Sequence, residues 1–237
     1  MADHLEYALH GDDLQIVELA LEPGQAARSE VGMMIYMDEG IKMQTSTGGG
    51  IIRGLKRMVT GESFFISSYK NISDAKQKVG FTAAYPGKVI PIDLQDEENG
   101  SFLCQKDAFL CAASGVETKV AFTKRFGSGL FGGEGFVLQR LKGDGLAFIH
   151  AGGTCIKRDL AEGEKLRIDS GCLVGLSESV DYGIKFVGGF KNKLFGGEGL
   201  FLAHLEGPGT VYLQSLPFSR LVDRIVTSAN LITQEEE

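Results

Sequence analysis

The sequence LFGGEGFVL at residues 130–138 recurs as LFGGEGLFL at residues 194–202. The same offset superimposes residues further upstream without a gap, since it aligns Val116 with Val180 and Phe122 with Phe186. A match that extends well beyond its motif is the signature of internal repetition. We therefore interpret this part of the chain as two copies of one structural unit.

A third, more divergent copy comes first in the chain. Residues 23–35 match residues 162–174, and the glycine motif survives as TGESFFI at residues 60–66. We place the approximate internal repeats at residues 13–94, 99–160 and 163–230. Because one such unit is too small to close its own core, the three must pack together, which predicts a single domain over residues 1–237.

The local pattern within each copy is typical of an all-β protein. Short runs of apolar and β-branched residues are separated by Gly, Asp, Asn or Pro. The chain also has 33 Gly, each of which destabilises a helix interior by about 1 kcal/mol relative to Ala. We predict strands at residues 15–19, 33–37, 64–69, 116–123, 136–141, 145–151, 182–187, 200–205 and 210–215.

One short helix is predicted near the C-terminus, over residues 217–229. Pro217 can occupy the first turn of a helix, and four apolar residues recur at helical spacing to form one face. These residues are Leu221, Val222, Ile225 and Val226.

Composition limits the partners and the cellular location. A formal net charge of -7 and a pI near 5.2 disfavour charge-driven binding to nucleic acid. Residues 1–14 lack the basic start and apolar run of a secretory signal. We expect a cytoplasmic protein whose four cysteines are ordinary buried thiols, with peripheral membrane association as the alternative. These cysteines are Cys104, Cys111, Cys155 and Cys172.

No enzyme signature emerges from the reactive residue types. His4, His10, His150 and His204 do not have the spacing of metal ligands on one face. The serine in residues 126–130, FGSGL, is one position short of a nucleophile elbow. We therefore predict no catalytic residues, no metal and no cofactor.

The glycine motifs allow a structural and a chemical interpretation. The favoured one is a repeated turn, with each Glu bonded to nearby backbone amides. The alternative is a carboxylate triad for acid–base chemistry or cation binding. The residues concerned are Gly61, Glu62, Gly133, Glu134, Gly197 and Glu198.

The loop before each glycine motif combines apolar tips with basic residues. Repeat equivalence would bring the three loops together, where they could form a subunit interface or a cap on the core. Contact with lipid is the alternative, because apolar tips gain by burial while bases meet phosphates. The predicted binding or interface residues are Ile51, Ile52, Arg53, Lys56, Arg57, Arg125, Leu130, Phe131, Lys193, Leu194 and Phe195.

The repeated motif, the apolar strand after it and the sequence VYLQSLPF at residues 211–218 resemble the mitochondrial biogenesis family named for altered inheritance of mitochondria. The resemblance covers nearly the whole chain. It implies a fold similar to the tryptophan RNA-binding attenuation protein superfamily, a double-stranded β-helix type of β-sandwich that assembles as oligomers. It implies no activity, although mitochondrial members are associated with inner-membrane organisation. Because this chain shows no transit peptide, we expect it to be a bacterial, cytoplasmic member.

The leading functional hypothesis is a non-enzymatic scaffold or binding protein that forms a homo-oligomer and could also bind a protein partner. Its motivation is the combination of repeated apolar–basic loops with the lack of a recognisable catalytic constellation. The alternative is binding to a membrane surface through these loops. Binding of RNA or of a small ligand ranks lower, since the chain has no Trp and only six Tyr for base stacking.

Overall fold

The computed structural model of the chain describes residues 5–46, 66–124, 136–187 and 200–235. The described residues are mostly β-strand, and every pairing between the named strands is antiparallel. A helix at the C-terminal end completes the fold. The predicted all-β class with a short C-terminal helix is thus confirmed.

The strands form three successive sets of six with one pairing scheme. In each set the sixth strand lies between the first and the third, and the fifth strand lies between the second and the fourth. The first set is β2 (Ile16–Leu21), β3 (Ala26–Glu30), β4 (Met34–Met37), β5 (Ile41–Ser46), β6 (Ile66–Asn71) and β7 (Gln77–Thr82).

The second and third sets repeat these pairings. The second set is β8 (Gly87–Asp93), β9 (Ser101–Gln105), β10 (Phe109–Ala113), β11 (Glu117–Lys124), β12 (Phe136–Lys142) and β13 (Leu146–Gly152). The third set is β14 (Cys155–Leu160), β15 (Lys165–Asp169), β16 (Leu173–Ser177), β17 (Asp181–Val187), β18 (Leu200–Glu206) and β19 (Gly209–Gln214). An additional strand, β1 (Glu6–His10), pairs with β2.

Short 3₁₀ turns precede several of these strands. They are η1 (Glu98–Gly100), η2 (Lys106–Ala108) and η4 (Ser170–Cys172). The second and third six-strand sets begin one strand earlier than the repeats predicted to start at residues 99 and 163. Either strand can be chosen as the start of a repeating unit. The repeat boundaries and the single domain therefore stay predictions.

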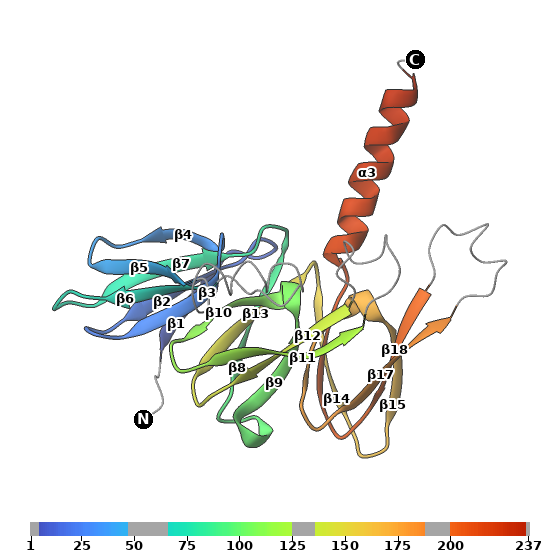
Figure 1. Cartoon of the computed structure of the whole chain (residues 1–237), viewed down its shortest axis with the longest axis horizontal. Helices are drawn as coiled ribbons and strands as arrows, with labels where there is room; N and C mark the ends of the chain where they lie inside the picture. Colours follow the sequence, from blue (N-terminus) through green and yellow to red (C-terminus); the bar gives the residue numbers. More distant parts are fainter. Residues whose placement is uncertain (1–4, 47–65, 125–135, 188–199, 236–237) are drawn as a thin grey trace.

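Two strand pairings join the sets to one another. The second strand of the first set, β3, pairs with the third strand of the second set, β10. In the same way, β9 of the second set pairs with β16 of the third set. Each joint combines three strands of one set and three strands of the next into a six-stranded sheet. Two smaller sheets remain at the ends of the array, β1-β2-β7-β4 and β15-β18-β17. Figure 1 shows the resulting array, with the second set between the first and the third.

The apolar core runs through the joints. One cluster combines residues of the first two sets, including Phe81 and Phe148, with Val174 of the third. A second cluster combines Leu103 and Leu138 of the second set with Leu176 and other residues of the third. Since the buried side chains at each joint come from both partners, the neighbouring sets stabilise each other.

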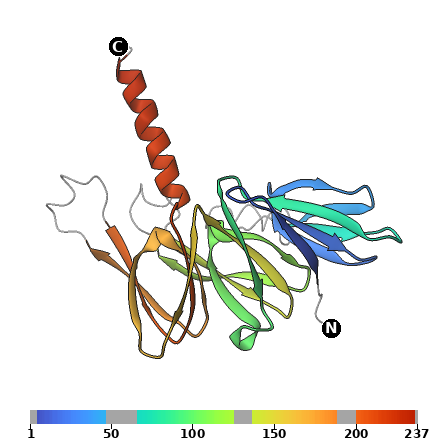
Figure 2. The same ribbon diagram turned by 180° about the vertical axis from the view of Figure 1, so that it is seen from behind.

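The helix α3 (Phe218–Glu235) projects away from the sheets, as Figures 1 and 2 both show. It is longer than the predicted 217–229 segment. Within the described part of the chain, no other element buries most of its predicted apolar face, since Val222, Ile225 and Val226 are exposed. The helix is anchored at its start, where the Phe218 ring packs on the Tyr85 ring with centroids 5.1 Å apart.

Candidate functional site: the edges of β4 and β15

The predicted interface residues and the glycine-motif residues all lie outside the described residues, so their roles stay predictions. The three loops are equivalent in the order of the chain, because each follows the fourth strand of its set and precedes the fifth. The strands that flank them are paired where the description stops, as Ser46 with Ile66, Lys124 with Phe136, and Val187 with Leu200. The residues outside the description are Ile51, Ile52, Arg53, Lys56, Arg57, Gly61, Glu62, Arg125, Leu130, Phe131, Gly133, Glu134, Lys193, Leu194, Phe195, Gly197 and Glu198.

A different surface is defined by the described residues. Strand β4 ends its sheet, with β7 as its neighbour among the described strands. Its residues Ile35, Tyr36 and Met37 are 44%, 39% and 37% exposed. This exposure forms an apolar strip along a sheet edge, which is a template for pairing with another strand.

The counterparts of β4 in the other two sets are completely buried. All residues of β10 and of β16 are buried, because each of these strands has a neighbour on both sides. Met37 corresponds to Ala112 and to Leu176, both 0% exposed. The exposed edge of β4 is therefore the place where the first set lacks, among the described strands, the neighbour that the other two sets have.

Strand β15 forms the complementary edge at the other end of the array. It pairs with β18, and within the described part of the chain it has no second neighbour. Its residues Lys165 and Arg167 are exposed. The corresponding residues of β9, Ser101 and Leu103, are 1% and 2% exposed because β9 is covered by β16.

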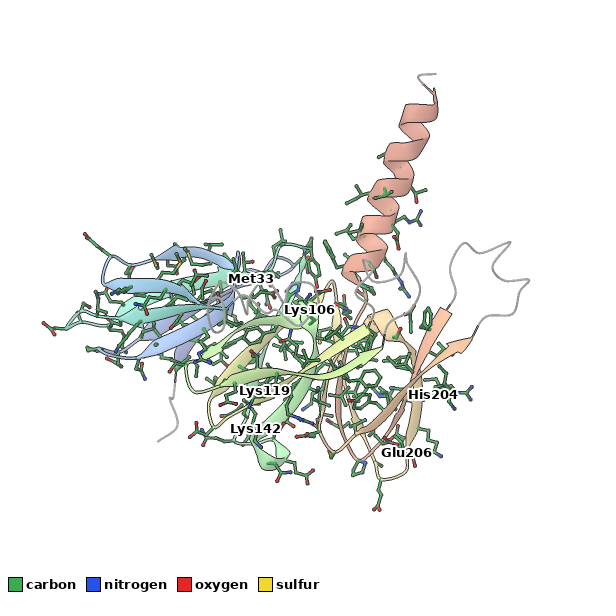
Figure 3. All side chains as sticks on the ribbon, in the orientation of Figure 1. Met33, Lys106, Lys119, Lys142, His204 and Glu206 are labelled. Atoms are coloured by element: carbon green, nitrogen blue, oxygen red, sulfur yellow. The ribbon has the colours of Figure 1, made fainter. Side chains whose placement is uncertain are left out.

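The two edges carry opposite charges. Glu39, the second residue after β4, is exposed, and Asp38 accepts a hydrogen bond from the Lys78 backbone N–H at 2.7 Å. On the other edge, Lys165 Nζ lies 3.3 Å from Glu206 Oε2. Figure 3 labels Glu206 and His204 on β18, beside β15. Edge β4 is thus acidic at its end, while β15 presents two bases.

The ring of Tyr36 holds β4 in place. Its hydroxyl donates to Glu18 of β2, and the ring lies over the backbone of Gly80, where an added Cβ would clash with the ring carbon Cε1. Burial, together with the hydrogen bond to Glu18, raises the pKa of Tyr36 to about 12. The hydrogen bond from Lys78 lowers the pKa of the Glu18 carboxyl, with a further contribution from Tyr36. Contacts with β2 and β7 of the same set therefore hold the apolar strip of β4 in position.

A buried histidine lies at the root of α3. His150 is 2% exposed, and its ring meets that of Tyr85 edge-on with centroids 4.7 Å apart. Burial lowers the pKa of His150 to about 4, which keeps the imidazole neutral. Its Nδ1 has no hydrogen-bond partner within the described part of the chain. His150 thus packs against Tyr85, which in turn contacts Phe218 at the start of the helix.

The thiols lie mainly in the interior. Cys104 and Cys111 are buried, whereas Cys155 and Cys172 are half-buried, and all four are free. Burial raises the pKa of each thiol, which disfavours the reactive thiolate. Among the described residues no three His, Cys, Asp or Glu side chains gather as a metal site. No helix in the described part is both long and apolar enough to cross a membrane.

Sequence reasoning missed the two edges. The signal for the β15 edge is present in the repeat alignment, where Leu103 is replaced by Arg167 and Ser101 by Lys165. Charge at a position that is buried in a sister copy indicates that the covering strand is missing.

Comparisons with known proteins agree with this fold. The family model described as "Mitochondrial biogenesis AIM24" matches residues 7–216. An uncharacterized protein, M6_Spy0233 of Streptococcus pyogenes serotype M6, is 29% identical over 209 residues, which cover 85% of this chain and 81% of that protein. The crystal structure of SPYM3_0169 from Streptococcus pyogenes is similar with a TM-score of 0.76 at 24% identity, covering 94% of this chain and 99% of the other. The structural likeness shows the fold alone, and none of these matches indicates a catalytic family.

Proposed function

The chain belongs to the Mitochondrial biogenesis AIM24 family, and we propose that it works as a self-associating scaffold without a catalytic reaction of its own. The observation that carries this proposal is the apolar strip on β4, which is exposed although the same strand is buried in both sister sets. An exposed, uncovered strand edge favours pairing with another chain. Self-association would give β4 the cover that its counterparts have.

The burial of several potentially reactive side chains supports the proposal of a non-catalytic role. The Cys104 and Cys111 thiols are fully buried, and their raised pKa values disfavour thiolate. The His150 imidazole packs against an aromatic ring and is closed to solvent. A nucleophile or general base needs access to a substrate and a pKa suited to its task. By contrast, two strand edges and a helix face are exposed among the described residues, and such surfaces suit association.

Size-exclusion chromatography with multi-angle light scattering tests the proposal. We expect the wild-type chain to have a mass that rises with concentration above the 25.5 kDa of one chain. The substitution Met37→Asp puts a charge on the β4 strip and should shift the mass towards that of one chain. A wild-type protein that stays monomeric up to high micromolar concentration would overturn the proposal.

Met43→Asp is the matched control. Met43 is also an exposed methionine on an edge strand, β5, with 44% exposure. Unlike β4, however, β5 has counterparts, β11 and β17, that also end their sheets among the described strands. The repeat therefore calls for no further neighbour at β5, and Met43→Asp should keep the wild-type mass. Equal effects of the two substitutions would indicate general charge repulsion instead of a specific edge.

A further inference from the structure

This inference rests on the proposed self-association. The strand pairings between the sets indicate which surface of another chain pairs with β4. We propose that β4 of one chain pairs with β15 of a second copy, antiparallel and head to tail, with Met37 opposite Arg167 and Glu39 opposite Lys165. This pairing would be a third joint of the kind that already links the sets within one chain.

The pairing scheme leaves these two strands over. Each joint in the chain connects the second strand of one set with the third strand of the next, as β3 with β10 and β9 with β16. The second strand of the last set is β15, and the third strand of the first set is β4. Among the described strands, both have a single neighbour. A further joint of the same kind therefore requires β15 and β4.

The existing joints fix the register of the new one. In the first joint Ala112 lies opposite Arg28, and in the second Leu176 lies opposite Leu103. Ala112 and Leu176 each lie just after a register shift in the pairing of their strand with the sixth strand of the set. This irregularity therefore marks the same position in the third strand of each set.

Strand β4 shows the same irregularity, which aligns it with its counterparts. Its register with β7 shifts between Met34 and Tyr36, so that Met37 takes the place of Ala112 and Leu176. On the partner strand, the repeat offset aligns Leu103 with Arg167, which pairs with His204 as Leu103 pairs with Arg140. The third joint therefore places Met37 opposite Arg167.

The backbone of β4 is prepared for this pairing. The Asp38 N–H donates inward to the Lys78 carbonyl at 2.9 Å. Because backbone groups alternate along a strand, the N–H and C=O of Met37 point to the open edge. In the first joint the Ser114 N–H donates to the Ala26 carbonyl at 3.1 Å, and these residues correspond to Glu39 and Lys165. Met37 and Glu39 thus present the groups that form the ladder in the sister joint.

Charge supports the same register. Glu39 would lie directly across from Lys165, and opposite charges facing each other across two strands are favourable. The second joint contains a related ion pair, in which Arg140 Nη2 of β12 lies 2.6 Å from Glu178 Oε1, just after β16. The repeat offset relates Arg140 to His204, and Glu178 holds the place of Glu39. The acidic residue thus meets a basic side chain in both cases.

A second copy, not the same chain, supplies the partner strand. The first and third sets lie on opposite sides of the second set in Figures 1 and 2, which separates β4 from β15 along the array. Figure 3 likewise labels His204, on the strand next to β15, in the third set, well away from the first. A contact between unlike surfaces of identical chains is heterologous, so it propagates into a ring or an open filament.

Charge exchange tests both the partner and the register. Glu39→Lys alone and Lys165→Glu alone each place like charges opposite one another, and each should raise the concentration for half-association about fivefold or more. An equimolar mixture of these two single variants should regain association, because the charges at positions 39 and 165 are opposite again wherever the two unlike chains meet. The double variant in one chain should regain it as well.

Cysteine cross-linking adds a direct readout. Chains with Met37→Cys mixed with chains with Arg167→Cys should give a two-chain band under mild oxidation, while each variant alone should give much less. Met43→Cys mixed with Arg167→Cys is the matched control and should not cross-link, since β5 takes no part in the joint.

The outcomes separate this inference from the proposed function. Rescue in the mixture together with the two-chain band supports the joint. A wild-type chain that associates, but whose association is unaffected by the charge changes and gives no two-chain band, overturns the joint and leaves the scaffold proposal standing. A double variant, Met37→Cys with Arg167→Cys in one chain, that cross-links only within itself overturns the second copy as the partner. A strictly monomeric wild type overturns both proposals.

Discussion

Strands β10 and β4 hold the same place in successive sets but have opposite surroundings. β10 lies between β13 and β3, and all its residues are buried, whereas β4 has β7 as its described neighbour and is mostly exposed. Their compositions follow this difference, because the joint accommodates the small Cys111 and Ala112 where β4 carries Tyr36 and Met37. The burial of the third strand is therefore produced by the neighbouring set, not by its own.

The largest expected effect compares one position in two surroundings. Leu176→Ala removes a side chain that is 0% exposed in the second joint, so unfolding should become easier by about 2–5 kcal/mol. Met37→Ala, at the equivalent position of the exposed β4 edge, should change the free energy of unfolding by no more than about 0.5 kcal/mol. Urea denaturation at a chain concentration below that of self-association measures both.

A control distinguishes position from side-chain type. Leu176→Met keeps an apolar side chain of similar volume in the joint and should cost less than about 1.5 kcal/mol. Equal losses for Leu176→Ala and Met37→Ala would contradict the difference between joint and edge.

The second expected effect concerns pH at a position in the sixth strand of each set. His150, Gln214 and Thr82 correspond to one another, and His150 alone among them can titrate. Its pKa is lowered from 6.5 to about 4 by burial. Between pH 6.5 and 4, His150 therefore binds a proton in the unfolded chain but stays mostly neutral in the folded chain. Stability is fully present above pH 6.5 and should fall by roughly 3 kcal/mol as the pH drops to 4.

Denaturant titrations from pH 7.5 to 4 in wild type and His150→Gln check this expectation. Glutamine is the residue found at the matching position of the third set, so it preserves a polar side chain without a titrating group. The variant should lose most of the decline between pH 6.5 and 4. An unchanged pH profile in the variant would assign the decline to other groups.

Much of the fold could be predicted from local patterns. The segments expected at 15–19, 145–151 and 182–187 correspond to β2, β13 and β17, because alternating and β-branched residues bounded by glycine leave few other conformations. The helix could be predicted from its apolar spacing, but its end could not, since no breaker follows Ala229.

The joints could not be predicted in the same way. The apolar run Phe109–Ala113 shows that this strand is buried but not which strand covers it, because apolar burial is not directional. Identifying the edges needs a comparison between copies, in which Leu103 is replaced by Arg167. The predicted loop residues, such as Phe131 and Phe195, lie outside the described part and stay predictions of a binding surface.

A third, smaller effect is expected at a close contact between the second and third sets. Gly175 of β16 lies against β9, and a Cβ there would be 2.6 Å from Phe102 Cε1 and 2.8 Å from the Leu103 carbonyl oxygen. Gly175→Ala should therefore cost about 1–3 kcal/mol through overpacking. The equivalent position on the exposed β4 edge is Tyr36, where a large side chain is accommodated. Thermal unfolding of Gly175→Ala measures this cost, and a fully tolerated alanine would show that the joint is looser than the contacts indicate.

The smallest effect should occur where α3 meets the end of β15. Arg220 Nη2 lies 2.5 Å from Asp169 Oδ2, while Asp169 Oδ1 accepts a hydrogen bond from the Gly171 N–H at 2.9 Å. Because the Arg220 side chain is about half exposed, Arg220→Ala should cost only about 0.2–1 kcal/mol. Asp169→Ala should cost more, since it also removes the acceptor for the Gly171 N–H, and Asp169→Asn should resemble Arg220→Ala. Denaturation of the three variants at low and high salt tests this order: the Arg220→Ala difference should shrink with salt, and a loss from Asp169→Ala no larger than from Arg220→Ala would show that the ion pair, not the turn, orders this end of the edge strand.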